Sequence, residues 1–339
     1  MRAFLIPSPG EGVVGNVAPP TAGTDQVVID VLRAGICGTD VSIFHRDDER
    51  ARHTRTHRPL RPLRPGHEWS GRIVDVGDGV PNEWLGRRVT GDTMIGCDHC
   101  ARCADGRHHV CHERFEVGIR GDWPGALAEQ LVMPIRSLYE LPDAVSYEAG
   151  AMVEPGANAY RAVAAAAIRP GFRVLVAGPG TIGLLGLLHA LARDAEVHVL
   201  GVDAAALGLA ASLGAHGAWT AESLPKLPWD AVINATDDAA MPQRAVELVE
   251  PGRRVVLIGS AHAPATIDTR MLMGKDVTAV GILGGSAGLA ATIAAYASGA
   301  VDPTPLIART IGLDGVANAL SGHAPRPGGR PKTLVDPRR

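Results

Sequence analysis

The sequence predicts an α/β protein with two domains: a β-rich first half and a doubly wound parallel sheet in the second half. The chain has 339 residues, and one domain usually takes about 100–200. Short alternating runs bounded by glycine and proline fill the first half, whereas apolar runs alternate with segments of helical length after about residue 150. Hydrophobic residues make up 46% of the chain, so a substantial core can form.

Four segments of the first half have the alternation of half-buried strands, with turn residues at their ends. They span residues 26–35, 70–80, 87–92 and 126–134. The pattern therefore predicts a mostly β domain.

The second half alternates short apolar strands with helical segments, as in a buried parallel sheet. The predicted strands span 173–178, 197–203, 229–236, 253–260 and 277–283, and the predicted helices span 181–194, 205–214, 241–250 and 287–299. The tail 331–337 is predicted to add a strand to the first domain. We expect a catalytic domain over 1–154, a nucleotide-binding domain over 155–297, and a return to the first domain over 298–339.

Charge and composition argue against several classes of protein. The net charge of −3 disfavours a nucleic-acid or anionic-membrane binder. The N-terminus has no signal-peptide pattern, and no segment reaches the roughly 18 uninterrupted apolar residues of a membrane helix. We therefore expect a cytoplasmic protein. Five cysteines fit a closed disulfide framework poorly, so clustered thiols are more often metal ligands.

The stretch "VAGPGTIG" has the G-x-G-x-x-G spacing of a dinucleotide site, between a predicted strand and a predicted helix. Its glycines allow a tight turn, close approach of a pyrophosphate, and close packing of helix on strand. Asp203 ends the next strand, and no arginine or lysine follows it directly, which favours NAD over NADP. The candidate cofactor contacts are Gly178, Gly180, Thr181, Ile182, Gly183, Asp203, Thr236 and Gly259. The alternative is a glycine-rich turn without a ligand, beside a surface aspartate.

Four of the five cysteines fall in "GCDHCARCADGRHHVC". Cys97, Cys100, Cys103 and Cys111 have the C-x2-C-x2-C-x7-C spacing, and four thiolates suit a closed, structural Zn²⁺ site in a lobe over about 96–112. The neighbouring histidines, His99, His108, His109 and His112, are rival ligands. An iron–sulfur cluster is a competing use, although the ferredoxin-type runs are spaced differently.

The remaining cysteine, Cys37, indicates a second metal site. His67 and Glu68 lie thirty residues downstream, and Glu154 lies at the seam between the two halves. A thiolate, an imidazole and a carboxylate leave the fourth zinc position open, as in catalytic sites. The alternatives are a buried packing cysteine and a hydrogen-bonded His-Glu pair.

Taken together, "GICGTD", "GHEWSG", the four-cysteine run, "EP" at residue 154 and "GPGTIG" resemble the zinc-dependent medium-chain dehydrogenase/reductases, the alcohol dehydrogenase superfamily, over nearly the whole chain. The resemblance implies a GroES-like β domain beside a Rossmann domain, with the active site between them. It also implies two zinc ions per chain: one held by Cys37 and His67, and one by the four clustered cysteines.

Within that superfamily, the sequence is similar to the polyol, sorbitol and threonine dehydrogenase branch, and to cyclitol and aminocyclitol dehydrogenases such as the 2-deoxy-scyllo-inosamine dehydrogenases. This similarity implies Glu154 as third zinc ligand and Glu68 as an exchanging or neighbouring one. Thr39 would accept the substrate proton, and Asp40 would support a ligand histidine.

Two segments depart from the family pattern. Ser42 lies where many members have a histidine that completes a proton relay. The run 46–64 contains seven arginines, together with Asp47, Asp48 and Glu49. The run is either a substrate-facing loop for an acidic group or, as we favour, a solvated surface loop.

The sequence therefore predicts an NAD-dependent enzyme that interconverts a secondary alcohol and a ketone, and the resemblance implies a homodimer or homotetramer paired through the strand 277–283. A zinc-free quinone or enoyl reductase is the nearest rival. From other classes, the rivals are a zinc-ribbon nucleic-acid-binding module and a non-catalytic NAD-binding protein.

Overall fold

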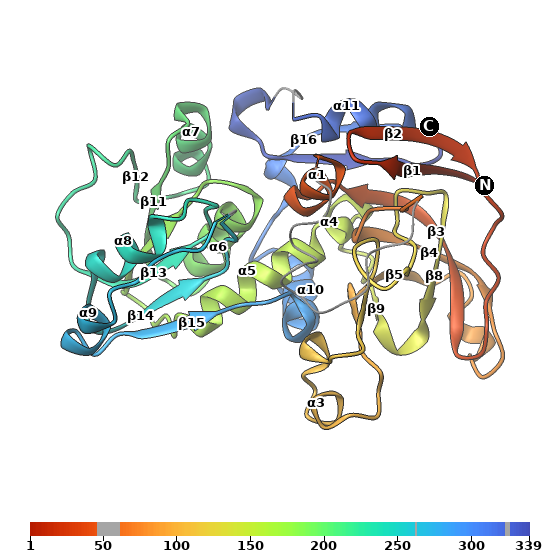
Figure 1. The fold of residues 1–339 in the computed structure, drawn as a ribbon, viewed down its shortest axis with the longest axis horizontal. Helices are drawn as coiled ribbons and strands as arrows, with labels where there is room; N and C mark the ends of the chain where they lie inside the picture. The colour runs from red at the N-terminus through yellow and green to blue at the C-terminus, as the bar shows by residue number, and fades with distance from the viewer. Residues whose placement is uncertain (46–61, 262, 323–325) are drawn as a thin grey trace.

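The computed structural model describes residues 1–45, 62–261, 263–322 and 326–339. Two sheets dominate it, and each belongs to a separate unit (Figure 1). One unit is β-rich and contains both termini, whereas the other is a parallel sheet covered by helices. The two-domain α/β fold predicted from the sequence is confirmed.

The β-rich unit is built on a seven-stranded sheet with the order β16-β17-β3-β4-β5-β9, in which β8 also pairs with β3. Its strands are β3 (Gln26–Gly35), β4 (Glu68–Val76), β5 (Arg88–Gly91), β8 (Gln130–Pro134), β9 (Leu138–Glu140), β16 (Ile307–Ile311) and β17 (Lys332–Val335). Alternate side chains of β3 enter a core with Phe4, Trp69 and Leu131. The ends of β3 and the start of β4 therefore lie beside a rigid, apolar interior.

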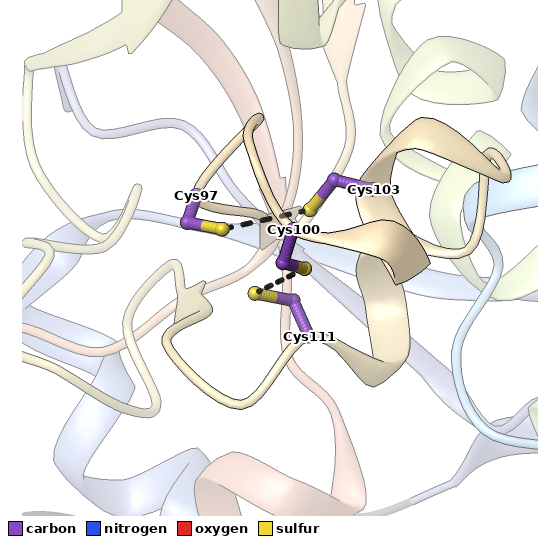
Figure 2. A group of neighbouring side chains, drawn as sticks. All are labelled: Cys97, Cys100, Cys103 and Cys111. Carbon is purple, nitrogen blue, oxygen red and sulfur yellow. Dashed lines mark hydrogen bonds between the residues drawn. The ribbon is translucent and has the colours of Figure 1, made fainter.

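Shorter elements complete this unit. Two small hairpins pair β1 (Arg2–Ser8) with β2 (Glu11–Asn16), and β6 (Met94–Ile95) with β7 (Phe115–Glu116). Helix α1 (Gly38–His45) follows β3 directly, and α11 (Val316–Leu320) packs near β2. Helix α3 (Ala101–Ala104) and the 3-10 turn η2 (His108–Val110) belong to the four-cysteine lobe, which projects from the unit at α3 (Figure 1) and whose cysteines are drawn in Figure 2.

The second unit has a six-stranded parallel sheet with the order β12-β11-β10-β13-β14-β15. Its strands are β10 (Arg173–Ala177), β11 (Glu196–Leu200), β12 (Gly217–Trp219), β13 (Trp229–Asn234), β14 (Val249–Leu257) and β15 (Thr278–Gly281). The order reverses between β10 and β13, and ligands of doubly wound sheets bind at such a switch point.

Helices cover this sheet because parallel strands must be connected by crossovers. They are α5 (Val153–Ala165), α6 (Thr181–Leu191), α7 (Ala204–Ser212), α8 (Met241–Leu248), α9 (Thr269–Gly274) and α10 (Leu289–Ala297). Helix α5 follows α4 (Tyr147–Ala151) and spans the predicted domain boundary at residue 154. Its alanine-rich face is buried against α6 and α10 of the second unit, and it also contacts β4 of the first.

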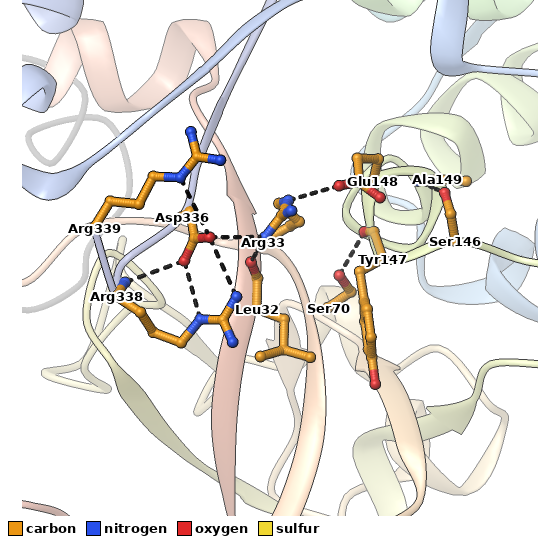
Figure 3. Close-up of polar contacts among 10 residues, drawn as sticks. All are labelled: Leu32, Arg33, Ser70, Ser146, Tyr147, Glu148, Ala149, Asp336, Arg338 and Arg339. Carbon is orange, nitrogen blue, oxygen red and sulfur yellow. Dashed lines mark hydrogen bonds and ion pairs between the residues drawn. The ribbon is translucent and has the colours of Figure 1, made fainter.

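The C-terminal segment returns to the first unit, where β17 pairs antiparallel with the end of β3. Just after β17, the buried carboxylate of Asp336 accepts hydrogen bonds from Arg33 at 3.1 Å and from Nε of Arg338 at 3.0 Å (Figure 3). Arg33 also donates to Glu148 at the start of α4, at 2.8 Å. This ion cluster ties the chain end to β3 and α4.

We expect D336N to destabilise the protein by about 1–3 kcal/mol at pH 7, because buried charged hydrogen bonds are lost. Burial alone would raise the pKa of Asp336, but Arg338 and Arg33 lower it below its usual value. The stabilisation is therefore present above the unfolded pKa of about 4 and is lost as the pH falls through the lower, folded pKa. Urea denaturation at pH 7 and at acid pH measures this difference.

The matched control is D143N, which removes an exposed carboxylate 3.5 Å from Arg88. It should shift stability by less than about 0.5 kcal/mol. Equal stability of D336N and the wild type at pH 7 would show that the ion cluster around Asp336 does not stabilise the fold.

Candidate active site and cysteine lobe

Cys37, His67 and Glu68 come together although thirty residues separate the thiol from the imidazole. Their ligand atoms all lie within 4.8 Å of one another. Cys37 lies between the end of β3 and the start of α1, while His67 and Glu68 stand at the start of β4. Because β3 and β4 are antiparallel neighbours, with Gly35 opposite Glu68, the two segments meet at the same end of the sheet.

Asp40 fixes this meeting point. Its buried carboxylate accepts the backbone N–H of Cys37 at 2.9 Å and that of Gly66 at 3.2 Å. It also lies 3.5 Å from Nδ1 of His67. Burial alone would lower the pKa of His67, but Asp40 and Cys37 raise it well above its usual value. The pocket therefore stabilises a positive charge at the imidazole, as a cation site requires.

A buried lysine faces the same group from β17. Nζ of Lys332 donates to both carboxylate oxygens of Glu68, at 2.8 and 2.6 Å, and to the carbonyl of Ile36 at 3.0 Å. Both charged side chains are only 1% exposed. Burial alone would lower the pKa of Lys332, but Glu68 and the other negative groups raise it, so the lysine stays charged.

Glu154 lies outside the group formed by the other three residues. It is in the first turn of α5, where Nδ2 of Asn158 donates to its carboxylate at 2.8 Å. Burial raises its pKa to about 7, with a further contribution from Glu68, while His67 and Asn158 oppose this shift. Glu154 is thus close enough to His67 and Glu68 to interact with them electrostatically. Its role as the third ligand stays a prediction.

The four clustered cysteines meet in the lobe, and each is a free thiol (Figure 2). All four sulfurs lie within 4.8 Å of one another, with Cys97–Cys103 at 4.0 Å and Cys100–Cys111 at 3.8 Å. Sulfurs about 2.3 Å from one tetrahedral zinc ion are about 3.8 Å apart, whereas a disulfide brings them to about 2.05 Å. The arrangement therefore fits a tetrahedral metal and no disulfide.

Backbone groups prepare two of these thiols for deprotonation. The backbone N–H of His99 lowers the pKa of Cys97, and that of Cys103 lowers the pKa of Cys100 to about 7. Burial instead raises the pKa of Cys103 to about 12. Four thiols this close cannot all ionise without a cation, because their charges repel.

The glycines of "GPGTIG" form the turn from β10 into α6. Gly178 has a φ of +97°, and a Cβ there would lie 2.9 Å from the side chain of Thr236. A Cβ on Gly183 would overlap the carbonyl of Gly178, while the space around Gly180 is open. Thr181 and Ile182 begin α6, so their backbone N–H groups lie at its N-terminus. This turn has the geometry that a pyrophosphate site needs.

The other candidate cofactor residues lie on the same carboxyl edge of the sheet. Asp203 follows β11 and caps α7, since its Oδ1 accepts the N–H of Ala206 at 2.7 Å. Thr236 follows β13, where its N–H and hydroxyl donate to Asn234. Gly259 follows β14, and a Cβ there would overlap the Thr236 backbone. The topology thus gathers these residues around the β10–β13 switch point.

Family models match both halves of the chain. Residues 23–143 match the alcohol dehydrogenase GroES-like domain, and residues 181–298 match the zinc-binding dehydrogenase domain. The chain belongs to the zinc-binding medium-chain alcohol dehydrogenase family. It is an NAD(P)-dependent oxidoreductase, as the sequence predicted.

Relatives of this dehydrogenase cover most or all of its length. An L-threonine 3-dehydrogenase from Chelativorans sp. (strain BNC1) is 33% identical over 296 residues, which is 84% of each chain. The structure of an alcohol dehydrogenase from E. coli CFT073 complexed with NADH has a TM-score of 0.90 and 26% identity, over 99% of each chain. That of a zinc-binding dehydrogenase from Sinorhizobium meliloti 1021 bound to NADP has a TM-score of 0.88 and 27% identity, over 99% of each.

The structure adds one residue that sequence reasoning missed. Lys332 is 264 positions from Glu68, and the one hint in the sequence is a lysine at the start of the short strand KTLV. Most of the arginine-rich segment lies outside the described residues. Its last arginine, Arg64, is described: it is buried, and burial lowers its pKa to about 10.

We expect K332M to lower the free energy of unfolding by about 3–5 kcal/mol, because Glu68 would then be a buried charge without its partner. The double variant E68Q/K332M removes both charges and should recover much of the loss. Urea denaturation of both variants measures this.

K226M, which changes an exposed lysine, is the control. The proposed contribution of the Lys332–Glu68 pair would be refuted if K332M had the same free energy of unfolding as the wild type, or if the double variant were no more stable than K332M.

Proposed function

We propose that this dehydrogenase interconverts a secondary alcohol and a ketone with NAD(H), at a catalytic zinc site formed by Cys37, His67 and one carboxylate. The observation that carries the proposal is the convergence of the Cys37 thiol and the His67 imidazole, with the Glu68 carboxyl beside them, within 4.8 Å at one end of the sheet, while Glu154 is close enough to interact with His67. Such a mixed set of three protein ligands leaves a position open for substrate, unlike the closed set of four sulfurs in the lobe.

Two carboxylates could complete the catalytic set. Glu68 is close enough to bind, but Lys332 holds both of its oxygens. Glu154 has one hydrogen bond from Asn158 and is the ligand that the sequence favours. We infer that Glu154 completes the set, directly or through water, and that Lys332 restrains Glu68 beside it.

When bound, zinc would lower the pKa of the substrate hydroxyl as a Lewis acid, and NAD⁺ would take up the hydride. Thr39 is two residues past Cys37, with its hydroxyl 3.9 Å from the sulfur, so it is placed to accept the substrate proton. Ser42 lies three residues later in α1, on the same helix face. It can carry that proton outward in place of the usual histidine. Asp40 keeps the His67 ring oriented.

The substrate class that we favour is a polyol, a cyclitol or aminocyclitol, or a β-hydroxy amino acid. The motifs "GHE" and "EP" support that branch, and one relative is named an L-threonine 3-dehydrogenase. Rates with secondary alcohols, polyols, cyclitols, aminocyclitols and threonine, each with NAD⁺ and NADP⁺, test this choice. The absence of oxidation throughout the panel would reject it.

We also propose that the chain forms a homodimer or tetramer. Strand β15 is at the edge of the six-stranded sheet and is largely exposed, so it could pair with its equivalent in a second copy. Among the described helices, none combines the length and apolar character needed to cross a bilayer. A cytoplasmic location stays a prediction.

We expect C37S to lose one of two zinc ions per chain, and kcat/KM to fall more than about 100-fold, since changes outside the ligand shell alone cost about 10- to 100-fold. Its melting temperature should stay near that of the wild type. C100S, the matched change in the lobe, should instead lower the melting temperature. Elemental analysis, calorimetry and kinetics measure these effects. A C37S protein with two zinc ions and full activity would remove Cys37 from the site.

The proposed preference for NAD rests on the charge of Asp203, which also caps α7. D203N keeps an acceptor for the cap but removes the charge, whereas D203A removes both. We expect both variants to lower the NAD/NADP ratio of kcat/KM about 10-fold or more, and only D203A to lose stability. An unchanged ratio in both would assign Asp203 to capping alone.

A further inference from the structure

Another buried aspartate, Asp92, joins the cysteine lobe to the nucleotide-binding unit. It follows β5 and is 4% exposed. Its Oδ2 lies 2.7 Å from Nε2 of His108, and its Oδ1 accepts the N–H of Met94 at 2.9 Å and the hydroxyl of Ser286 at 3.0 Å. One carboxylate therefore bonds its own loop at Met94 and two further segments, the cysteine lobe 16 residues away and the segment of Ser286 194 residues away.

The first of these segments is the lobe itself. His108 begins η2, between the predicted ligands Cys103 and Cys111, and its carbonyl accepts the N–H of Cys111 at 2.9 Å. The histidine was a rival metal ligand from the sequence, but the structure shows it bonded to Asp92 instead. A shift of the lobe would therefore displace the carboxylate of Asp92, to which the His108 ring is bonded.

The second segment runs from Ile282 to Gly288, directly after β15. It begins at the carboxyl edge of the parallel sheet, where the N–H of Ile282 donates to Leu257 at the end of β14. A Cβ on Gly285 would lie 3.0 Å from the carbonyl of Glu154, so the segment packs against the first turn of α5. It therefore lies between the proposed cofactor edge and the proposed catalytic carboxylate.

A parallel contact runs through α5. Nη1 of Arg161 donates to the carbonyl of Leu283 at 2.6 Å and also to that of Gly284. Its Nη2 lies 3.5 Å from Nε2 of His109, the buried neighbour of His108. Two adjacent histidines of the lobe are thus linked to the same segment, His108 through Asp92 and His109 through Arg161.

We propose that Asp92 is a positioning residue through which the folded cysteine lobe holds residues 282–288 in place, and so sets the affinity for the dinucleotide. Lobe and cofactor edge are then energetically coupled, because each contributes one hydrogen bond to the same buried carboxylate. This inference rests on the dinucleotide site of the proposed function.

A double-mutant cycle on the two sides of Asp92 tests the coupling: H108A, S286A and H108A/S286A, with C100S to disrupt the lobe itself. NADH binding is followed by fluorescence titration, with melting temperature as a check on folding. We expect H108A, S286A and C100S each to raise the Kd for NADH about five- to tenfold, the value of one buried hydrogen bond. The double variant should be no weaker than the weaker-binding single variant. KM for the dinucleotide should rise in S286A while kcat stays within about twofold of the wild type.

S298A is the matched control, because its hydroxyl bonds only within its own helix end and is exposed. The proposal would be overturned if S286A and H108A fold and bind NADH within twofold of the wild-type affinity. It would also be overturned if the increase in Kd of the double variant equals the product of the two single increases. If H108A does not fold, S286A and C100S replace it in the test: NADH affinity within twofold of the wild type in both variants would overturn the proposal. A wild-type protein that binds no NADH would instead count against the proposed function.

Discussion

The carboxylate of Asp40 is the interaction on which the candidate active site depends. It is fully buried, and it bonds the backbone on both sides of the site, at Cys37 and at Gly66. It also lies 3.5 Å from Nδ1 of His67. Without it, the buried N–H of Gly66 would lack a partner, at a cost of roughly 1–3 kcal/mol, and so would the part-buried N–H of Cys37. The thiol and the imidazole therefore meet because a third residue satisfies the backbone that carries them.

Charge balance explains why so many ionisable groups can be buried around that point. Cys37, Glu68 and Glu154 place three acidic side chains in one region, and Lys332 lies beside them as a buried basic group. Burial raises the pKa of Glu154 to about 7, so this acid tends to keep its proton. The pKa of His67 is raised well above its usual value, so this base tends to gain one. Both shifts reduce the excess of acidic groups in the region. A divalent cation would replace both protons, so the protein environment favours its binding.

Local patterns predicted the elements and the clustered cysteines because those depend on neighbours in sequence. The predicted strand 26–35 is β3 to the residue, and the predicted helix 181–194 contains α6. Helix α5 was missed, since "EPGANAY" carries proline and glycine and reads as a loop, although its small residues pack tightly against α10. The pairing of Lys332 with Glu68 was also missed, because it arises only when β17 joins β3. Local spacing cannot specify such long-range pairing.

Asp40 and Asp92 follow one structural principle with different consequences. Each is a buried carboxylate that accepts a backbone N–H close to it in sequence and faces a histidine from a distant segment. Around Asp40 the histidine is a proposed metal ligand, so the aspartate controls the reacting centre directly. Around Asp92 the histidine belongs to a lobe that holds no proposed catalytic group, and the third partner is Ser286 in the other unit. In the proposed zinc site, four sulfurs around one ion would stabilise the lobe without this bond. The bond is better explained by what it does for the segment beyond β15, which must keep its place at the cofactor edge.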